Sequence, residues 1–237
     1  MSTVKVQRIG KEVWADLRLA PMFSGLGESD LADLLADATL ETHGDGTVMF
    51  RHGDVLDQLF IVVDGHVETY VEAPDGRRSI IEIVEKLGLL GDAGILGDSG
   101  ALVSARVLNT ATVVAVPAAP FLAKLSRRFD LILLMLGSMS FRLRLLVRQI
   151  SELKLKTTAQ RLGGFLLTLT DFTAGEVTVR FPYDKRVVAE QLGMKPESLS
   201  RALARLAAVG VRSQADNVVI IADVARLRRF SIEEGME

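Results

Sequence analysis

The chain has 237 residues and a formal net charge of only −2, so a basic surface would have to be confined to one part of it. It contains no cysteine, which excludes disulfides, thiolate zinc sites and cysteine-ligated iron–sulfur clusters. Its most apolar stretch, Leu131–Leu136, is far shorter than the roughly 20 residues of a membrane-spanning helix. We therefore expect a soluble, cytoplasmic protein that does not bind membranes.

The N-terminal half predicts one helix followed by β-structure. Leucines at helical spacing indicate a helix over Glu28–Leu40. From Thr47 to Val116, apolar runs of about five residues alternate with Gly, Asp and Pro turns. Short strands at this spacing are typical of an antiparallel barrel or sandwich, either with or without a ligand.

From Phe129 the apolar pattern changes to that of a helix with one narrow stripe. Its members recur at alternating spacings of four and three: Ile132, Leu136, Met139, Leu143, Leu146, Ile150 and Leu153. Such a stripe is what a coiled-coil seam requires, whereas an ordinary core helix, which is the alternative, usually shows a wider one. We expect this helix to form the interface of a homodimer.

The C-terminal part predicts a winged helix-turn-helix. A helix over Ala159–Leu169 and a strand pair around Val177–Phe181 lead to two further helices, which are separated by a turn at Gly193 and followed by a hairpin over Val211–Ile221. From residue 156 to residue 230, twelve basic residues stand against seven acidic ones. This part of the chain is therefore the cationic one, as a domain that binds DNA would be.

The second helix of the pair, which starts at Pro196, carries the side chains that would contact DNA. Arginine bonds guanine, glutamate accepts from cytosine, and serine reaches a thymine edge or a phosphate. An intrahelical Glu197–Arg201 ion pair on a solvated face is the alternative. We expect the DNA-binding residues to be Lys195, Glu197, Ser198, Ser200, Arg201, Arg205 and Arg212.

The segment KRVVAEQLGMKPESLSRALARL, residues 185–206, closely resembles the helix-turn-helix of the Crp/Fnr family of bacterial regulators. Glu197, Ser200 and Arg201 look like the Fnr-type motif, which reads half-sites of the TTGAT kind. Leu59–Val67 is similar to the family's strand-Gly-strand signature. The resemblance implies an α+β protein. Its parts would be an antiparallel β-roll (cyclic-nucleotide-binding-like, cupin-like) that senses an effector over residues 1–127, a long dimerisation helix over 128–155, and a winged helix-turn-helix over 156–237.

The resemblance also implies a function. An effector in the β-roll would shift the paired DNA-binding domains of a transcription regulator that is not an enzyme. The implied partners are double-stranded DNA, a second copy of the chain, RNA polymerase, and a small-molecule or gas effector. Two alternatives stay open: a cyclic-nucleotide-dependent regulator, and a sensor that acts through protein partners without DNA. No Gly-rich nucleotide loop, His-rich metal motif or nucleophile elbow supports an enzyme.

The expected effector pocket departs from that of the cyclic-AMP members. Asp92 stands where they usually carry glutamate, and their phosphate-binding Arg-Ser pair falls near Leu102 and Val103. Because a buried phosphodiester needs a cationic partner, we expect cyclic AMP not to be the effector. The residues that occupy the pocket positions, including those of the adenine-contacting hydroxyl pair, are Gly91, Asp92, Ala93, Leu102, Val103, Arg106, Val147 and Arg148.

The C-terminal half is most similar to the Dnr-like nitric-oxide regulators, which are thought to sense through haem. The histidines available as axial ligands are His43, His52 and His66, each beside a turn or a strand end, where histidine is common. Met135 and Met139 lie at helical spacing, which is typical of a core. Haem therefore stays open as a cofactor, and the sequence does not name the effector or the target genes, nor distinguish activation from repression.

Overall fold

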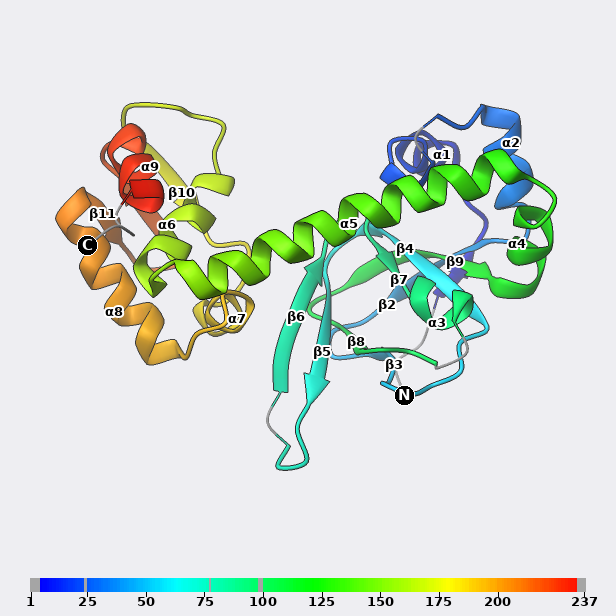
Figure 1. The fold of residues 1–237 in the computed structure, drawn as a ribbon, viewed down its shortest axis with the longest axis horizontal. Helices are drawn as coiled ribbons and strands as arrows, with labels where there is room; N and C mark the ends of the chain where they lie inside the picture. The colour runs from blue at the N-terminus through cyan, green and yellow to red at the C-terminus, as the bar shows by residue number, and fades with distance from the viewer. Residues whose placement is uncertain (1–4, 24, 77, 98–99, 234–237) are drawn as a thin grey trace. The chain divides into compact units, whose positions relative to one another are not determined.

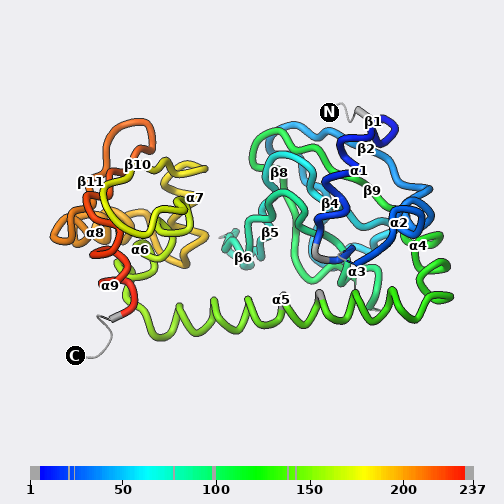
Figure 2. The backbone as a smooth tube through the Cα atoms, turned by 90° about the horizontal axis from the view of Figure 1, so that it is seen from above, coloured from blue at the N-terminus to red at the C-terminus, as the bar shows by residue number. Residues whose placement is uncertain are grey.

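The computed structural model describes residues 5–23, 25–76, 78–97 and 100–233. The chain forms two compact units, one up to Leu143 and one from Arg144 onward. The division falls inside a single long helix, α5 (Phe129–Leu155), which Figure 2 shows as one uninterrupted rod. In the described part of the chain, no helix is both long and apolar enough to cross a membrane.

The first unit is built on two antiparallel sheets (Figure 1). The larger sheet has the order β1 (Lys5–Gln7), β2 (Thr39–His43), β9 (Ala111–Pro117), β4 (Gln58–Asp64) and β7 (Leu89–Leu90). The smaller sheet has the order β3 (Val48–Phe50), β8 (Ser104–Val107), β5 (Val67–Glu72) and β6 (Arg78–Val84). The predicted β-domain is therefore present.

The larger sheet is apolar on both faces, which gives the unit two cores. Along β4, Leu59 and Ile61 face one core while Phe60 and Val62 face the other, because successive side chains of a strand point to opposite sides. The first core lies under the helices. The second lies between the sheets and is filled mainly by small and branched residues.

Short helices complete the first unit: α1 (Lys11–Leu17), α2 (Glu28–Leu34), α3 (Asp92–Leu96) and α4 (Ala118–Leu125), with a 3-10 turn over Pro21–Phe23. The predicted helix Glu28–Leu40 is wrong in its second half. Thr39 and Leu40 belong to β2, where Leu40 pairs with Val114. Pairing with a neighbouring strand therefore overrides the helical spacing of the leucines there.

The start of α5 is fixed to the first unit by packing and by charge. Leu131 and Met135 are buried in the core under the helices. Arg128 pairs with Asp30 of α2 and with Asp130, at 2.7 Å in both cases. The guanidinium lowers the pKa of both carboxyl groups below their ordinary values through these hydrogen bonds. The first turn of α5 is thus held against α2.

In its described residues, the second unit contains four further helices around a small sheet. Its helices are α6 (Thr158–Thr168), α7 (Lys185–Gln191), α8 (Pro196–Leu206) and α9 (Val224–Glu233), and a 3-10 turn spans Ala207–Val209. The sheet has the order β10 (Val177–Arg180), β12 (Val218–Ile221) and β11 (Val211–Ser213). Helix α6 packs against both α8 and α9. A capping box formed by Thr157 and Gln160 marks its start.

The predicted strand pair around Val177–Phe181 is a single strand. Its partner is β12, about 40 residues later, with Val179 opposite Val219. The hairpin predicted over Val211–Ile221 is present and turns at Asp216 and Asn217, both at positive φ. Helix, glycine turn, helix and hairpin therefore follow one another as expected.

Candidate nucleic-acid interface, dimer surface and effector pocket

The turn between α7 and α8 depends on a glycine. Gly193 has φ +62°, a left-handed conformation that side chains rarely adopt. Its amide donates to the carbonyl of Glu190 at 3.0 Å, and the amide of Met194 donates to that of Ala189 at 2.9 Å. Pro196 occupies the first position of α8, where its missing N–H costs nothing. These local features set the direction in which α8 leaves the turn.

Helix α8 is buried on one side and presents the predicted readers on the other. Leu199, Ala202 and Leu206 are buried. The exposed residues include Lys195, Glu197, Ser200, Arg201 and Arg205, while Ser198 is half-buried. This division places the predicted reading residues on one accessible face.

The predicted alternative for Glu197 and Arg201 is not what the structure contains. The Nη2 of Arg201 donates to the hydroxyl of Ser198 at 3.2 Å, and among the described contacts there is no ion pair between Arg201 and Glu197. The hydroxyl of Ser200 donates to the carbonyl of Pro196 at 3.3 Å. Both bonds are solvent-exposed, so these side chains are accessible from outside the protein.

The hairpin is tied to the start of the helix pair by a contact that the sequence did not reveal. The Nζ of Lys185, the first residue of α7, donates to the hydroxyl of Ser213 on β11 at 3.0 Å. Arg212, beside Ser213, is exposed. No local spacing signals this bond, because the two residues are 28 positions apart. It fixes the hairpin beside α7.

The predicted seam of α5 is largely uncovered in the single chain. Leu136, Leu143, Leu146, Ile150 and Leu153 are exposed, whereas Ile132 and Met139 are half-buried. Leu143, the most exposed of them, has 62% of its surface accessible. A continuous stripe of exposed leucine and isoleucine is characteristic of a surface that another protein covers.

Part of the predicted effector pocket comes together around α3. Gly91 caps α3 with φ +80°, Asp92 and Ala93 form its first turn, and a Cβ at Gly94 would lie 3.5 Å from the Cα of Ala101, which adjoins Leu102. Leu102 is 60% exposed and Val103 is half-buried. Neither position supplies a cation to this neighbourhood.

Two other predicted pocket residues belong to the second unit. Val147 is exposed, and Arg148 pairs with Glu152 one helical turn further along, with 3.6 Å between Nε and Oε1. Both are on α5, beyond the point where the units divide.

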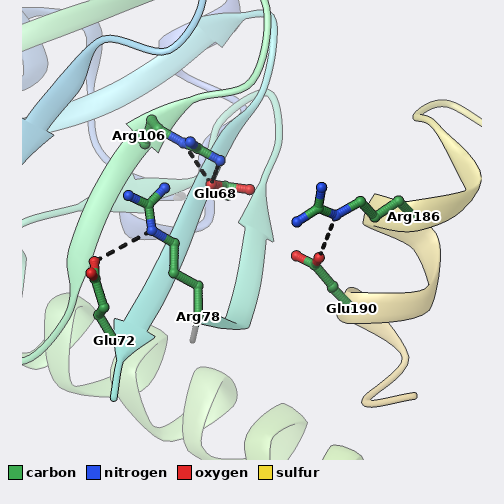
Figure 3. Close-up of polar contacts among 6 residues, drawn as sticks. All are labelled: Glu68, Glu72, Arg78, Arg106, Arg186 and Glu190. Atoms are coloured by element: carbon green, nitrogen blue, oxygen red, sulfur yellow. Dashed lines mark hydrogen bonds and ion pairs between the residues drawn. The ribbon is translucent and has the colours of Figure 1, made fainter. Parts of the chain in front are cut away.

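Arg106 lies on the face of β8 that points away from the core between the sheets. Its neighbours Ala105 and Val107 are both in that core, so the alternation of the strand turns Arg106 outward. There it pairs with Glu68, its register partner on β5, through Nε at 2.8 Å and through Nη2 (Figure 3). Glu68 is only 3% exposed, so Arg106 is the cation that offsets the burial of its carboxylate.

The Glu68–Arg106 pair is part of a ladder across the outer face of the smaller sheet. The guanidinium carbons of Arg106 and Arg78 lie 6.0 and 5.0 Å from the ring centre of Tyr70. Arg78 in turn pairs with Glu72 at 3.3 Å (Figure 3). The ladder therefore engages Arg106 in contacts between strands.

Figure 3 also shows a separate ion pair within α7, between Arg186 and Glu190, with 3.1 Å between Nε and Oε1.

The three histidines occupy separate places in the first unit. His43 is buried at the end of β2, where its Nε2 lies 3.0 Å from Oε2 of Glu41. His52 is exposed in the turn after β3, and His66 is half-buried between β4 and β5. Met135 is buried in the helical core, and Met139 is half-buried. Among the described residues, no group of three or more histidine, aspartate or glutamate side chains is placed to hold a metal ion.

Comparison with known proteins agrees with this architecture. A model of the cyclic nucleotide-binding domain matches residues 40–128, and a model of the Crp-like helix-turn-helix domain matches residues 160–230. One solved structure, of a candidate cyclic nucleotide binding protein from Ruegeria pomeroyi, is 31% identical in sequence to this chain. It covers 95% of this chain and is itself covered completely, with a TM-score of 0.67.

Two further relatives span nearly the whole chain. The CRP-like cAMP-activated global transcriptional regulator of Mycobacterium tuberculosis is 24% identical over 217 residues, which are 90% of this chain and 97% of that protein. The structure of DNR from Pseudomonas aeruginosa is 26% identical and covers 94% of this chain and 100% of its own, with a TM-score of 0.53.

A cyclic-nucleotide-binding-like domain joined to a winged helix-turn-helix defines a DNA-binding transcription regulator, not an enzyme. The chain belongs to the Crp/Fnr family of these regulators. The predicted fold class is thereby confirmed.

The structure predicts different costs for two arginines of the ladder. Arg106→Ala should lower the free energy of unfolding by about 2 kcal/mol, because it leaves the buried Glu68 carboxylate without its partner. Arg78→Ala should lower the free energy of unfolding by less than about 1 kcal/mol, because the Arg78–Glu72 ion pair is solvent-exposed. Urea denaturation of the two variants measures the difference. Equal losses would contradict the structural role assigned to Arg106.

Proposed function

We propose that the protein is a homodimeric, sequence-specific transcription regulator that an effector switches through the first unit. The observation that carries this proposal is the exposed face of α8 with Glu197, Ser200 and Arg201, on which the described contacts include no ion pair between Glu197 and Arg201. In this proposal residues 1–127 sense the effector, residues 128–155 pair the chains, and residues 156–237 bind DNA. RNA polymerase is the partner through which such a regulator would act.

In the proposed scheme, some side chains of the interface contact base edges and others contact phosphates. Arg201 would bond guanine, Glu197 would accept from a cytosine amino group, and Ser200 would contact a thymine edge, as in an Fnr-like TTGAT half-site. The arginine would have only an exposed hydrogen bond to Ser198 to give up. Lys195, Ser198, Arg205 and Arg212 would mainly hold phosphates and so set the register.

The proposed dimer pairs the stripe of α5 with the same stripe of a second chain. Two copies would thereby present two α8 helices to one palindrome. Covering the exposed leucines removes apolar surface from water, which is the main source of affinity in such a seam.

The proposed effector is not a cyclic nucleotide. The core between the sheets is made of apolar residues, the positions near Leu102 and Val103 supply no cation, and Arg106 is engaged by Glu68 on the opposite face. An anionic phosphodiester there would lack its main charge partner. A small apolar molecule, a gas, or haem carrying a gas fits the surroundings better.

A cyclic nucleotide is the second candidate effector. The match of residues 40–128 to the cyclic nucleotide-binding domain favours it, as does the left-handed Gly91 that caps α3 next to Asp92. Calorimetry with cyclic AMP should detect no saturable binding at micromolar concentrations, and the absorbance spectrum should be measured on the same sample. Micromolar binding would establish the second candidate, whereas a Soret band would establish haem.

The first test of DNA reading is a pair of arginine variants titrated against cognate and base-substituted palindromes. Arg201→Ala should weaken the cognate site by about 1–3 kcal/mol and relax the preference at one position of each half-site, because a bidentate base contact is lost. Arg212→Ala should weaken all duplexes alike and reduce the salt slope by about one unit, because fewer counterions are released. If Arg201→Ala lowers cognate and scrambled binding equally, α8 does not read sequence.

A second test concerns the dimer. Leu143→Glu should weaken self-association by about two orders of magnitude or more, because it places a charge in the apolar seam. Leu145→Glu is the matched control, since Leu145 is also exposed on α5 but lies off the stripe, and it should leave the dimer intact. Light scattering across a dilution series measures both. A monomeric wild type would refute the seam.

A further inference from the structure

Leu153 is the last residue of the seam stripe and also touches the turn of the helix-turn-helix. It is 49% exposed, so only part of its surface is available to a second chain. The other part faces Gly193, because a Cβ built on Gly193 would lie 2.8 Å from Cδ2 of Leu153. The side chain therefore packs directly on the bare backbone of the turn. Both residues belong to the second unit.

The backbone of the same residue is held from another direction. The Nη1 of Arg161 on α6 donates to the carbonyl of Leu153 at 3.3 Å. This carbonyl lies in the last turn of α5, where helix carbonyls lack partners of their own and a cation is favoured. The end of α5 is thus fixed to α6 by its carbonyl and to the turn by its side chain.

The turn that Leu153 contacts is the element that sets the direction of α8. Its two hydrogen bonds, from Gly193 to Glu190 and from Met194 to Ala189, lie beside this contact. A change in how Leu153 packs on Gly193 therefore acts directly on the turn that precedes α8. Ile150, one turn earlier in the stripe, is exposed to a similar extent, at 52%.

We infer that Leu153 is a positioning residue shared by the dimer seam and the turn, so that pairing of the two α5 helices stabilises the turn that orients α8. The inference rests on the proposed dimer. When a second chain covers the exposed half of Leu153, the side chain loses alternative rotamers and is held on Gly193. One side chain is then biased by two sites, which is the requirement for energetic coupling between them.

The test is a cycle of variants read by hydrogen exchange at the Gly193 and Met194 amides, with the amides of α6 as internal reference. In the full-length protein, Leu143→Glu should speed exchange at the two turn amides by about three- to tenfold, because the monomer no longer holds Leu153 in place. Leu153→Ala should produce a similar increase in the dimer. Leu143→Glu added to Leu153→Ala should then have no further effect.

Ile150→Ala is the matched control. It removes a comparable stripe residue that has no atom within 4 Å of a Cβ built on Gly193, so Leu143→Glu should retain its effect on the turn amides in that background. The inference is overturned if Leu143→Glu leaves exchange at the turn unchanged, or if it has its full effect even with Leu153→Ala. Light scattering on each sample reports the seam itself.

A second cycle tests the contact without changing the seam residue Leu143. Gly193→Ala is strained by its positive φ and also meets Leu153, so Leu153→Ala should recover part of the loss in DNA affinity and in turn protection. If the effects of the two substitutions on DNA affinity and on turn protection are strictly additive, the contact between Leu153 and Gly193 does not couple the two residues. A wild-type dimer that binds no palindrome would refute the proposed function, whereas the exchange cycle, which uses no DNA, would still decide the inference.

Discussion

Seven apolar side chains follow one stripe of α5, and five of them are exposed in the single chain. Leaving such a stripe in water is unfavourable by about 25 cal/mol per Å² of apolar surface, so a second chain that covers it gains free energy from every member. The same helix begins in the core of the first unit and ends beside the turn of the helix-turn-helix. Pairing through the stripe would therefore act on both units through one continuous element.

The first unit combines the fold of a cyclic-nucleotide-binding-like domain with different side-chain chemistry around α3. Its sheets and the turn at Gly91 are those of a cyclic-nucleotide-binding-like domain. The chemistry around α3 differs, because Leu102 and Val103 are apolar and Arg106 is engaged across the sheet by the buried Glu68. The fold thus supports a regulator, while the charges argue for an effector that is not a phosphodiester.

The long helix and the helix-turn-helix could be predicted because their signals are local. A repeated spacing gives α5, and Gly193 with Pro196 marks the turn and the start of α8. The errors arose where distant strands decide the structure. Thr39 and Leu40 are drawn into a sheet by β9, and Val177–Arg180 pairs with β12 instead of a neighbour.

In the candidate site, too, the positions of some side chains could be predicted from local spacing, whereas those of others depend on distant parts of the chain. The exposure of the predicted DNA-reading residues of α8 follows from helical spacing. By contrast, the side of β8 on which Arg106 lies depends on strand register, where a shift of one residue reverses the face. Three other contacts join separate elements, so no pattern in the sequence predicts them. They are the hydrogen bonds from Lys185 to Ser213 and from Arg161 to Leu153, and the packing of Leu153 on Gly193.

In the proposed regulator, α5 pairs two chains so that two α8 helices read one palindrome. The most direct measurement is the affinity of the wild-type protein for duplexes in which the two TTGAT-type half-sites are separated by spacers lengthened one base pair at a time. Pairing through α5 predicts one sharp optimum, with the half-site centres about 10–10.5 base pairs or a multiple of that apart, and a complex of two chains per duplex. Affinity that does not vary with the spacer, or equally tight binding of one chain to a single half-site, would contradict it.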